Sequence, residues 1–521
     1  MRQQNWPDCV SICSILQEQG GMRDIMHRLH VSIRQKTGAA ARLLLYKSLL
    51  AVALCASQAV NASQYSPPGL YDIDHLTLDN GLDVIFKQRP GAHTLSVRLW
   101  VGVGMQDFEC EHQETPHFLE HLLFTGTSRY SEAELEHLVA DHGGSWNAYT
   151  GNEETVYEMD IYSRYPDVAI NTLYEILTDS IISEENVETS RDIIHREVGG
   201  KPSKVRQWFR LRGFGVNGTE KAVMKLLPGV DYVCEGLRTA DHISRQDILD
   251  TYERYYVPEN MALIVVGDFE RAPMLALIEQ TFGQIPLMQS PRRELPEPGI
   301  PQDYEQETGT MSPLLSNDAV IGILYGIPGF WSDDIFPLMI IEHYLDFKIS
   351  EEIRINRGLS YSPGVWRETL SKFGLFSVYA DVDLDDIDEA MDIIKSEVTK
   401  LVDESMDGEL LEKSKMKILL QNVQGYESNS QFADYYASDY VYFKEKGYFE
   451  DIEAKIEAVT PDDISRVAEK YLSLEKGVVI YEIPTLTTTQ FYVVMTLLVL
   501  FILSSVLYLY FKTHSRIRRQ K

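Results

Sequence analysis

The chain has 521 residues, of which 44% are hydrophobic and 24% are charged, and it contains 33 glycines and 21 prolines. This composition is typical of a folded protein and excludes collagen-like, mucin-like and wholly disordered chains. The formal net charge is −30, which argues against binding to the phosphate backbone of nucleic acids. The length predicts more than one packed unit.

The amino-terminal region has the pattern of a leader and signal peptide, residues 1–62. Residues 43–62 read LLLYKSLLAVALCASQAVNA, an apolar run with the small residues Val60 and Ala62 before an expected cleavage point after Ala62. An organellar presequence is the alternative for the first part of this leader. The translation start is left open among three methionines: Met1, Met22 and Met26.

The carboxy-terminal region predicts a membrane anchor. Residues 491–511 form a charge-free apolar run that is long enough to cross a hydrocarbon layer of about 30 Å as a helix. The basic tail, residues 512–521, should remain in the cytoplasm, which places the acidic body across the membrane. We expect a single pass through a bacterial inner membrane with the body in the periplasm. An organellar membrane, and an apolar packing helix in a soluble protein, are the alternatives.

The body divides at a segment rich in proline and charge, residues 286–312, which we interpret as a linker. The flanking regions, 65–285 and 313–484, both contain a capped helix that leads into a β-branched strand, beginning at Ser244 and Thr460. We therefore expect an α+β fold with two homologous domains, each a mixed or antiparallel β-sheet covered by helices, plus the carboxy-terminal transmembrane helix. Two strand-like runs also match: LSVRLWVGVG from Leu95 and AVIGILYGIPG from Ala319.

The body keeps two cysteines, Cys110 and Cys234. One disulfide is compatible with an oxidising compartment, but two cysteines are too few for a disulfide scaffold. Whether they pair with each other is left open.

A short helix is expected at Thr115-Pro116, with Thr115 as its amino-terminal cap. It contains the sequence HFLEHLLF, in which His117 and His121 are four residues apart and share one face. Two imidazoles one helical turn apart can occupy two corners of a metal tetrahedron, and Glu120 between them can hold the attacking water. This is the inverted H-x-x-E-H pattern of zinc peptidases. The alternative is a surface helix with two solvated histidines.

Several motifs together resemble those of the M16, or pitrilysin-like, zinc metallopeptidases. This family includes the mitochondrial processing peptidases. The similarity covers approximately residues 70–484. The motifs on which it rests are LDNGLDVIF from Leu78, HFLEHLLFTGT from His117, GGSWNAYTGNEETVY from Gly143, HREV from His195 and RINRGLSYS from Arg354.

The resemblance implies a third metal ligand at Glu197, 76 residues after His121. A plain exposed helical glutamate is the alternative for this position. The resemblance also implies that Glu120 is the general base of peptide hydrolysis. Asn147 and Ala148, on the first strand of a predicted hairpin, would pair with an extended substrate through main-chain hydrogen bonds.

In the second half, Arg354 and Tyr361 match a family pair that anchors substrate and stabilises the oxyanion at the zinc site. An interdomain salt bridge with a packing tyrosine is the alternative, and Arg357 is the nearest wrong assignment. The sequence also departs from the family at two places. Ser190 stands where many members have a second glutamate, and Glu114 with its two successors replaces small apolar residues.

The sequence therefore predicts a membrane-anchored zinc endopeptidase that cleaves extended peptides or unfolded segments, with one Zn²⁺ per chain. Because family members enclose substrate with four such domains, the resemblance implies a homodimer or a heterodimer with a related subunit. Two alternative functions remain open: a non-catalytic binding or assembly subunit, and a processing peptidase with narrow specificity for leader peptides. The physiological substrate and the metal used in vivo are not determined by the sequence.

Overall fold

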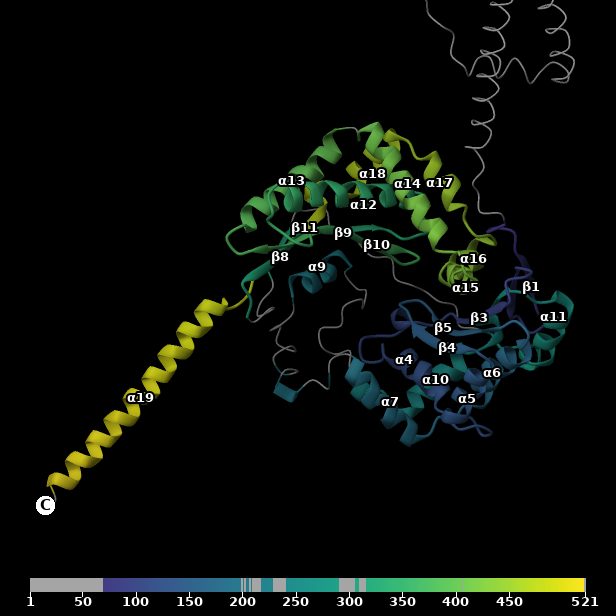
Figure 1. The fold of residues 1–521 in the computed structure, drawn as a ribbon, viewed down its shortest axis with the longest axis horizontal. Coiled ribbons are helices and arrows are strands. Elements are labelled where there is room, and N and C mark those ends of the chain that lie inside the picture. Colours follow the sequence, from purple (N-terminus) through teal and green to yellow (C-terminus); the bar gives the residue numbers. More distant parts are fainter. Residues whose placement is uncertain are drawn as a thin grey trace, which may run out of the picture. The chain divides into compact units, whose positions relative to one another are not determined.

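The computed structural model describes residues 69–197, 217–227, 240–289, 305–308, 315–404 and 406–519, together with 200, 203–205 and 208. The expected leader and signal peptide, most of the expected linker, and Cys234 lie outside the described residues. Cys110 is disulfide-bonded. The segment Leu70–Lys521 forms one compact unit, and its ribbon is shown in Figure 1.

The first half of this unit is built on a six-stranded sheet in the order β1-β2-β6-β3-β5-β4. Within it, β2 and β6 pair in parallel, and the other neighbours pair antiparallel. The strand β4 is therefore an edge strand with one free side in the sheet. The strands are β1 Asp74–Thr77, β2 Asp83–Gln88, β3 Thr94–Val101, β4 Ser145–Thr150, β5 Thr155–Tyr162 and β6 Met261–Gly267.

Helices from the same half cover one face of this sheet. Apolar side chains that alternate along the strands, such as Leu95, Val97 and Leu99, form the main core with them, as the period of two requires. The helices are α4 Thr115–Phe124, α5 Glu132–Asp141, α6 Pro166–Asp179, α7 Glu184–Glu197, α10 Arg245–Tyr255 and α11 Arg271–Gln280. Short 3-10 turns complete this half at Met105–Asp107, Ala240–His242, Pro258–Asn260 and Phe282–Gln284.

The second half repeats the design with a five-stranded sheet in the order β7-β11-β8-β10-β9. Only β7 and β11 pair in parallel, so both sheets are mixed and the expected α+β class is confirmed. The strands are β7 Glu305–Thr308, β8 Asp318–Pro328, β9 Gly364–Thr369, β10 Phe373–Asp383 and β11 Gly477–Glu482. The segment expected as a linker thus contains β7, a strand of the second sheet.

One face of the second sheet packs against helices that Figure 1 shows gathered on one side of it. The principal ones are α12 Ile335–Ile349, α13 Ile387–Asp403, α14 Gly408–Gln424, α17 Ile452–Ala458 and α18 Pro461–Tyr471, and a π-helical segment, η5 Ser350–Ile355, follows α12. A 3-10 turn, Leu474–Lys476, precedes β11.

The two capped helices expected from the repeat are both present. Ser244 caps α10 by accepting from the amide of Asp247, and Thr460 caps α18 by accepting from the amide of Asp463. Each helix leads into a buried strand, β6 or β11. The equivalent positions of these units in the two sheets agree with duplicated halves.

The two halves exchange helices. The second face of the first sheet is covered by α15 Asn429–Ser438 and α16 Tyr440–Lys446, which come from the second half of the chain. In return, α9 Gly218–Leu226 packs from the first half against the second face of the second sheet. Each sheet is therefore buried on both faces, and neither half completes its core alone.

A buried arginine of the first sheet binds α15, one of the exchanged helices. Arg98 on β3 is 1% exposed, and its guanidinium donates to Asp434 of α15 at 2.6 Å and to Ser430 at 2.7 Å. Asp160 on β5 lies 3.3 Å from the same group. Because a poorly paired guanidinium in the interior would be costly, the contacts from α15 help to stabilise Arg98 within the first sheet.

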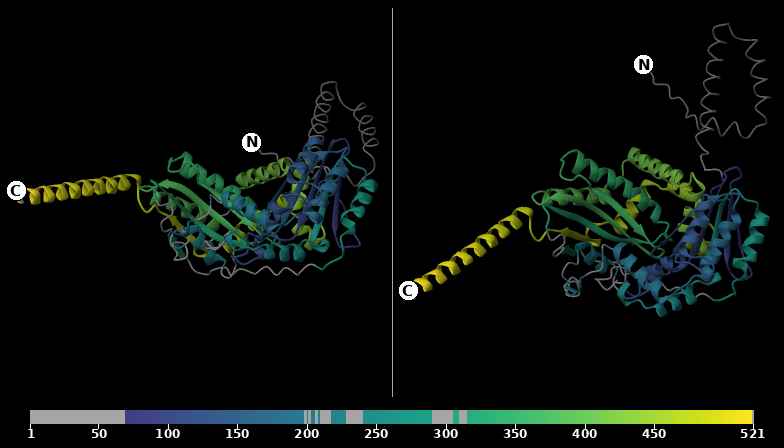
Figure 2. Two further views of the ribbon diagram at one scale, coloured as in Figure 1. Left: turned by 90° about the horizontal axis from the view of Figure 1, so that it is seen from below. Right: turned by 60° about the horizontal axis from the view of Figure 1, so that its bottom comes forward.

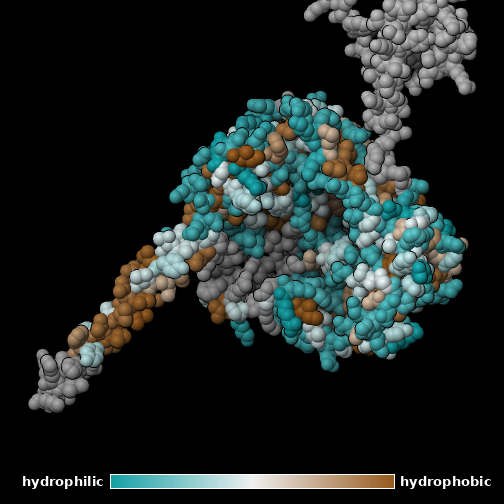
Figure 3. Space-filling model, viewed as in Figure 1, coloured by the Kyte–Doolittle hydropathy of each residue, from teal (hydrophilic) through white to brown (hydrophobic). Residues whose placement is uncertain are grey.

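The last helix, α19 Thr488–Arg519, differs from all others in its surroundings. Its stretch Thr488–Lys512 contains an apolar segment with a mean hydropathy of 2.4 that is not buried within the protein. Figure 2 shows it as one continuous helix, and Figure 3 shows hydrophobic side chains along its surface. By length and composition it is the one helix among the described residues that could cross a membrane.

Candidate metal centre

The helix α4 carries the histidine motif between the first sheet and α7. It begins at Thr115, with Glu114 as its amino-terminal cap, and Pro116 occupies the first turn. The expectation that Thr115 caps the helix was wrong, because its hydroxyl donates instead to the carbonyl of His112 at 2.7 Å. The face opposite the histidines is apolar and fully buried, through Phe118, Leu119, Leu122 and Leu123, which fixes the rotation of α4 about its axis.

The helix α7 brings a carboxylate to the motif. Its buried side chains Val187 and Ile194 belong to the same core as α4, and Arg191 stacks over the Phe118 ring at 5.2 Å. Glu197 is the last residue of α7 and is exposed on the side that faces the histidines. The packing of the two helices thus sets the position of this carboxylate.

Three potential ligand atoms meet at this point. The Nε2 atoms of His117 and His121 are 3.1 Å apart, and the Glu197 Oε2 atom lies 3.2 Å from the first and 3.5 Å from the second. Zinc–nitrogen bonds of about 2.0–2.1 Å at tetrahedral angles place donor atoms about 3.3 Å apart. The three side chains therefore fit one ion. Among the described residues, they form the cluster of histidine and carboxylate side chains that could hold a metal.

Glu120 lies beside this triangle without belonging to it. Its Oε2 atom accepts a hydrogen bond from the hydroxyl of Thr150 at 2.7 Å, and it lines the same cavity as the three ligands. Thr150 is the last residue of β4, so the edge strand holds the carboxylate of α4 in place. Sequence reasoning missed this role of Thr150, because thirty residues separate the two partners.

The cavity beside the triangle has a volume of about 590 Å³. Asn147 and Ala148 line it from the edge strand β4, and Trp146 closes one wall by packing edge-on against Phe124 at 4.6 Å. An edge strand next to a cavity offers unpaired main-chain groups to an extended chain. The two residues expected to contact substrate are thus beside the potential metal ligands.

The ring of His117 is held on its other side by a second carboxylate. Glu114 Oε2 lies 2.9 Å from His117 Nδ1. Burial opposes protonation of this imidazole, but the hydrogen bond to Glu114 and the charges of Glu120 and Glu197 raise its pKa above the usual value. Sequence reasoning noted Glu114 only as an unusual residue, although its spacing of three from His117 could have indicated the contact.

Arg354 and Tyr361 lie elsewhere. They stack on each other, with the guanidinium carbon 4.7 Å from the ring centre, and Tyr361 is 77% exposed. Neither is among the residues that line the cavity of the metal centre. Arg357 pairs with Glu352 and Glu389.

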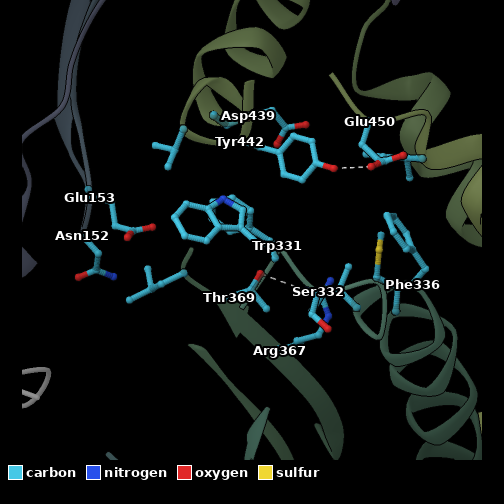
Figure 4. Close-up of a pocket in the computed structure, with 18 of the residues that line it drawn as sticks. Asn152, Glu153, Trp331, Ser332, Phe336, Arg367, Thr369, Asp439, Tyr442 and Glu450 are labelled. Carbon is cyan, nitrogen blue, oxygen red and sulfur yellow. Dashed lines mark hydrogen bonds between the residues drawn. The ribbon is translucent and has the colours of Figure 1, made fainter. Parts of the chain in front are cut away.

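A second cavity, of about 520 Å³, lies where the turn after β4 meets the second half of the chain (Figure 4). Its acidic side chains have protein partners: Glu153 accepts from the amide and hydroxyl of Ser371, and Glu450 accepts from Tyr442. Burial raises the pKa of Asp439 there to about 6. The contact of Glu153 with Ser371 joins the two halves, so we interpret the cavity as part of their junction.

Models of two known protein families match the sequence, and one of them covers the residues of this site. The model of the insulinase family, peptidase family M16, matches residues 83–209, which include both histidines, Glu120 and Glu197. The model of the peptidase M16 inactive domain matches residues 242–418. The chain belongs to peptidase family M16.

Individual relatives extend over most of the chain. An uncharacterized zinc protease of Streptomyces coelicolor is 23% identical over 78% of this chain and 88% of its own. The β subunit of the mitochondrial processing peptidase of Lentinula edodes is 26% identical over 76% of this chain and 86% of its own. The periplasmic protease PqqL of Escherichia coli has a similar fold, with a TM-score of 0.61 and 16% identity over 79% of this chain and 47% of its own.

The contact between Thr150 and Glu120 yields a prediction. Thr150→Val keeps the size and strand preference of the side chain but removes the donor, so kcat for peptide cleavage should fall by about 10- to 100-fold, as expected for losing a hydrogen bond to a charged group. Thr150→Ser should retain most of the activity. Zinc content should be unchanged in both variants, and an equally active valine variant would show that Thr150 does not position Glu120.

Proposed function

We propose that the protein is a membrane-anchored, zinc-dependent endopeptidase that hydrolyses extended peptides or unfolded segments. The observation that carries this proposal is the triangle formed by His117, His121 and Glu197, with donor atoms 3.1 to 3.5 Å apart. We infer one Zn²⁺ per chain at this site. The zinc-protease names of relatives and the family membership support the same activity.

The residues around the triangle have separate tasks in this reaction. A zinc ion held there would act as a Lewis acid toward water and the scissile carbonyl. Glu120 takes the proton of the attacking water and later delivers it to the leaving amine, while Thr150 holds its carboxylate. Asn147 and Ala148 align the peptide along β4, which selects chains that are already extended.

Replacing the general base separates catalysis from metal binding. Glu120→Gln should retain one zinc per chain by elemental analysis, because this side chain is outside the ligand triangle. Its kcat on a quenched fluorescent peptide should fall at least about 100-fold, the usual contribution of general acid–base catalysis. A matched control is Glu132→Gln, which removes another carboxylate of the same cavity and should remain active. Robust cleavage by Glu120→Gln would refute the mechanism.

A non-catalytic binding or assembly subunit is the second candidate, favoured by the match of the inactive-domain model to residues 242–418. The complete triangle and the general base in the first half weigh against it. A protein that binds zinc stoichiometrically but shows no chelator-sensitive cleavage would support this candidate. A narrow leader-peptide processing activity would appear as cleavage restricted to one class among unrelated peptides.

The position of Arg354 and Tyr361 supports a dimer. Both donate hydrogen bonds that suit an oxyanion, yet their stacked, exposed pair is not part of the cavity in its own chain. We infer that a second chain, identical or related, supplies this pair to the metal centre. Since this chain has both sets of residues, self-association is sufficient to complete the site.

Mixing two inactive variants tests this arrangement. Glu120→Gln lacks the base and Arg354→Ala lacks the anchor, so each alone should be inactive. Mixed dimers combine the intact base of one chain with the intact arginine of the other, which should restore about a quarter of wild-type activity for random twofold pairing. Arg357→Ala, which removes a locally paired arginine, should be active without mixing. Absence of recovery on mixing would contradict an identical partner.

The proposed location rests on α19 and on the basic tail that forms its end. We propose that this helix anchors the protein in a bacterial inner membrane with the body in the periplasm. The apolar length of Thr488–Lys512 supports anchoring, and the basic tail supports the orientation. In spheroplasts, external protease should digest the body and leave an epitope placed after Lys521 protected. Digestion of that epitope in sealed spheroplasts would contradict the orientation.

A further inference from the structure

We propose that Glu114 is a positioning residue that orients His117 and sets the affinity of the site for zinc. This inference rests on the proposed function, since it concerns the metal that the triangle would hold. It assigns a task to a residue that lies outside both the ligand triangle and the cavity.

The two nitrogens of the His117 ring face different partners. Its Nδ1 atom is 2.9 Å from Glu114 Oε2, while its Nε2 atom is 3.1 Å from His121 Nε2 and 3.2 Å from Glu197 Oε2. A carboxylate can only accept, so the proton of the neutral ring is held on Nδ1. The lone pair is then left on Nε2, the atom that faces the other two ligands.

The carboxylate belongs to a buried residue. Glu114 is 4% exposed, and its carbonyl accepts from the amide of Phe118 at 2.9 Å in the first turn of α4. Its side chain does not cap the helix, so it is not required there for the amide groups of the first turn. Because Glu114 and His117 are on the same turn, their contact does not depend on distant packing.

A carboxylate on the far nitrogen of a metal-binding imidazole fixes the ring orientation and increases its basicity. The effect should be unequal for the two histidines. Among the described residues, the hydrogen-bond and ion-pair contacts of His121 are made by Nε2 and not by Nδ1. His117 is therefore the ligand whose geometry is set before the ion arrives.

Ser190 does not provide this contact. It is 1% exposed, and its hydroxyl has no hydrogen-bond partner among the described residues. It lines the cavity from α7, whereas Glu114 contacts His117 from the start of α4.

The test measures zinc affinity rather than turnover. The full chain, purified in detergent, is titrated with zinc against a chromophoric chelator. Glu114→Gln keeps the shape but removes the charge, and its dissociation constant for zinc should rise about 10- to 100-fold. The matched control is Glu111→Gln, which removes an exposed charge three residues earlier and should bind zinc as the wild type does.

A second variant separates orientation of the ligand from stability of the helix. Serine is a favourable amino-terminal cap, so Glu114→Ser should preserve the start of α4 while removing the carboxylate. Its zinc affinity should fall as in the glutamine variant, with the metal-free unfolding temperature close to that of the wild type.

Wild-type zinc affinity in the folded Glu114→Ser protein would overturn the inference, and so would a loss of metal-free stability with unchanged affinity. Neither result would affect the proposed peptidase activity. If the wild-type chain itself failed to bind zinc, the proposed function would fail first. The two hypotheses are thus distinguishable in one series of titrations.

Discussion

The packing of α4 against α7 is the interaction on which the metal centre depends. It places the carboxylate of Glu197 between two imidazole nitrogens that are held one helical turn apart. The apolar face of α4, buried against the sheet, prevents rotation of the histidines away from this carboxylate. A displacement of one ångström between the helices would spoil the tetrahedral separations, because donor positions around zinc are narrowly defined.

The exchange of helices between the halves extends this constraint to the whole body. The first sheet carries β4 and its cavity, yet its second face is completed by α15 from beyond residue 400. Arg98 joins α15 to the sheet through Asp434 and Ser430. The metal centre and the edge strand are therefore supported by a core that needs nearly the full length of the body, although all three potential ligands come from the first half.

The sequence predicted local features well and distant ones poorly. The spacing of His117 and His121 predicted their common face, and the resemblance indicated Glu197, which lies at the end of a helix that reaches them. The hairpin at β4 was also visible from alternation and glycine turns. The contact of Thr150 with Glu120 and the exchange of α9 and α15 could not be predicted, since they depend on tertiary packing between segments with no shared periodicity.

The candidate metal centre distributes three carboxylates around two imidazoles. Glu197 faces the Nε2 atoms, where a cation would compensate its charge. Glu114 faces Nδ1 of His117 and stabilises the ring orientation. Glu120 faces Thr150 and the cavity, where it can exchange protons. Under the proposed function the same functional group would act as ligand, support or base according to the atom it faces, which is why composition alone cannot assign these tasks.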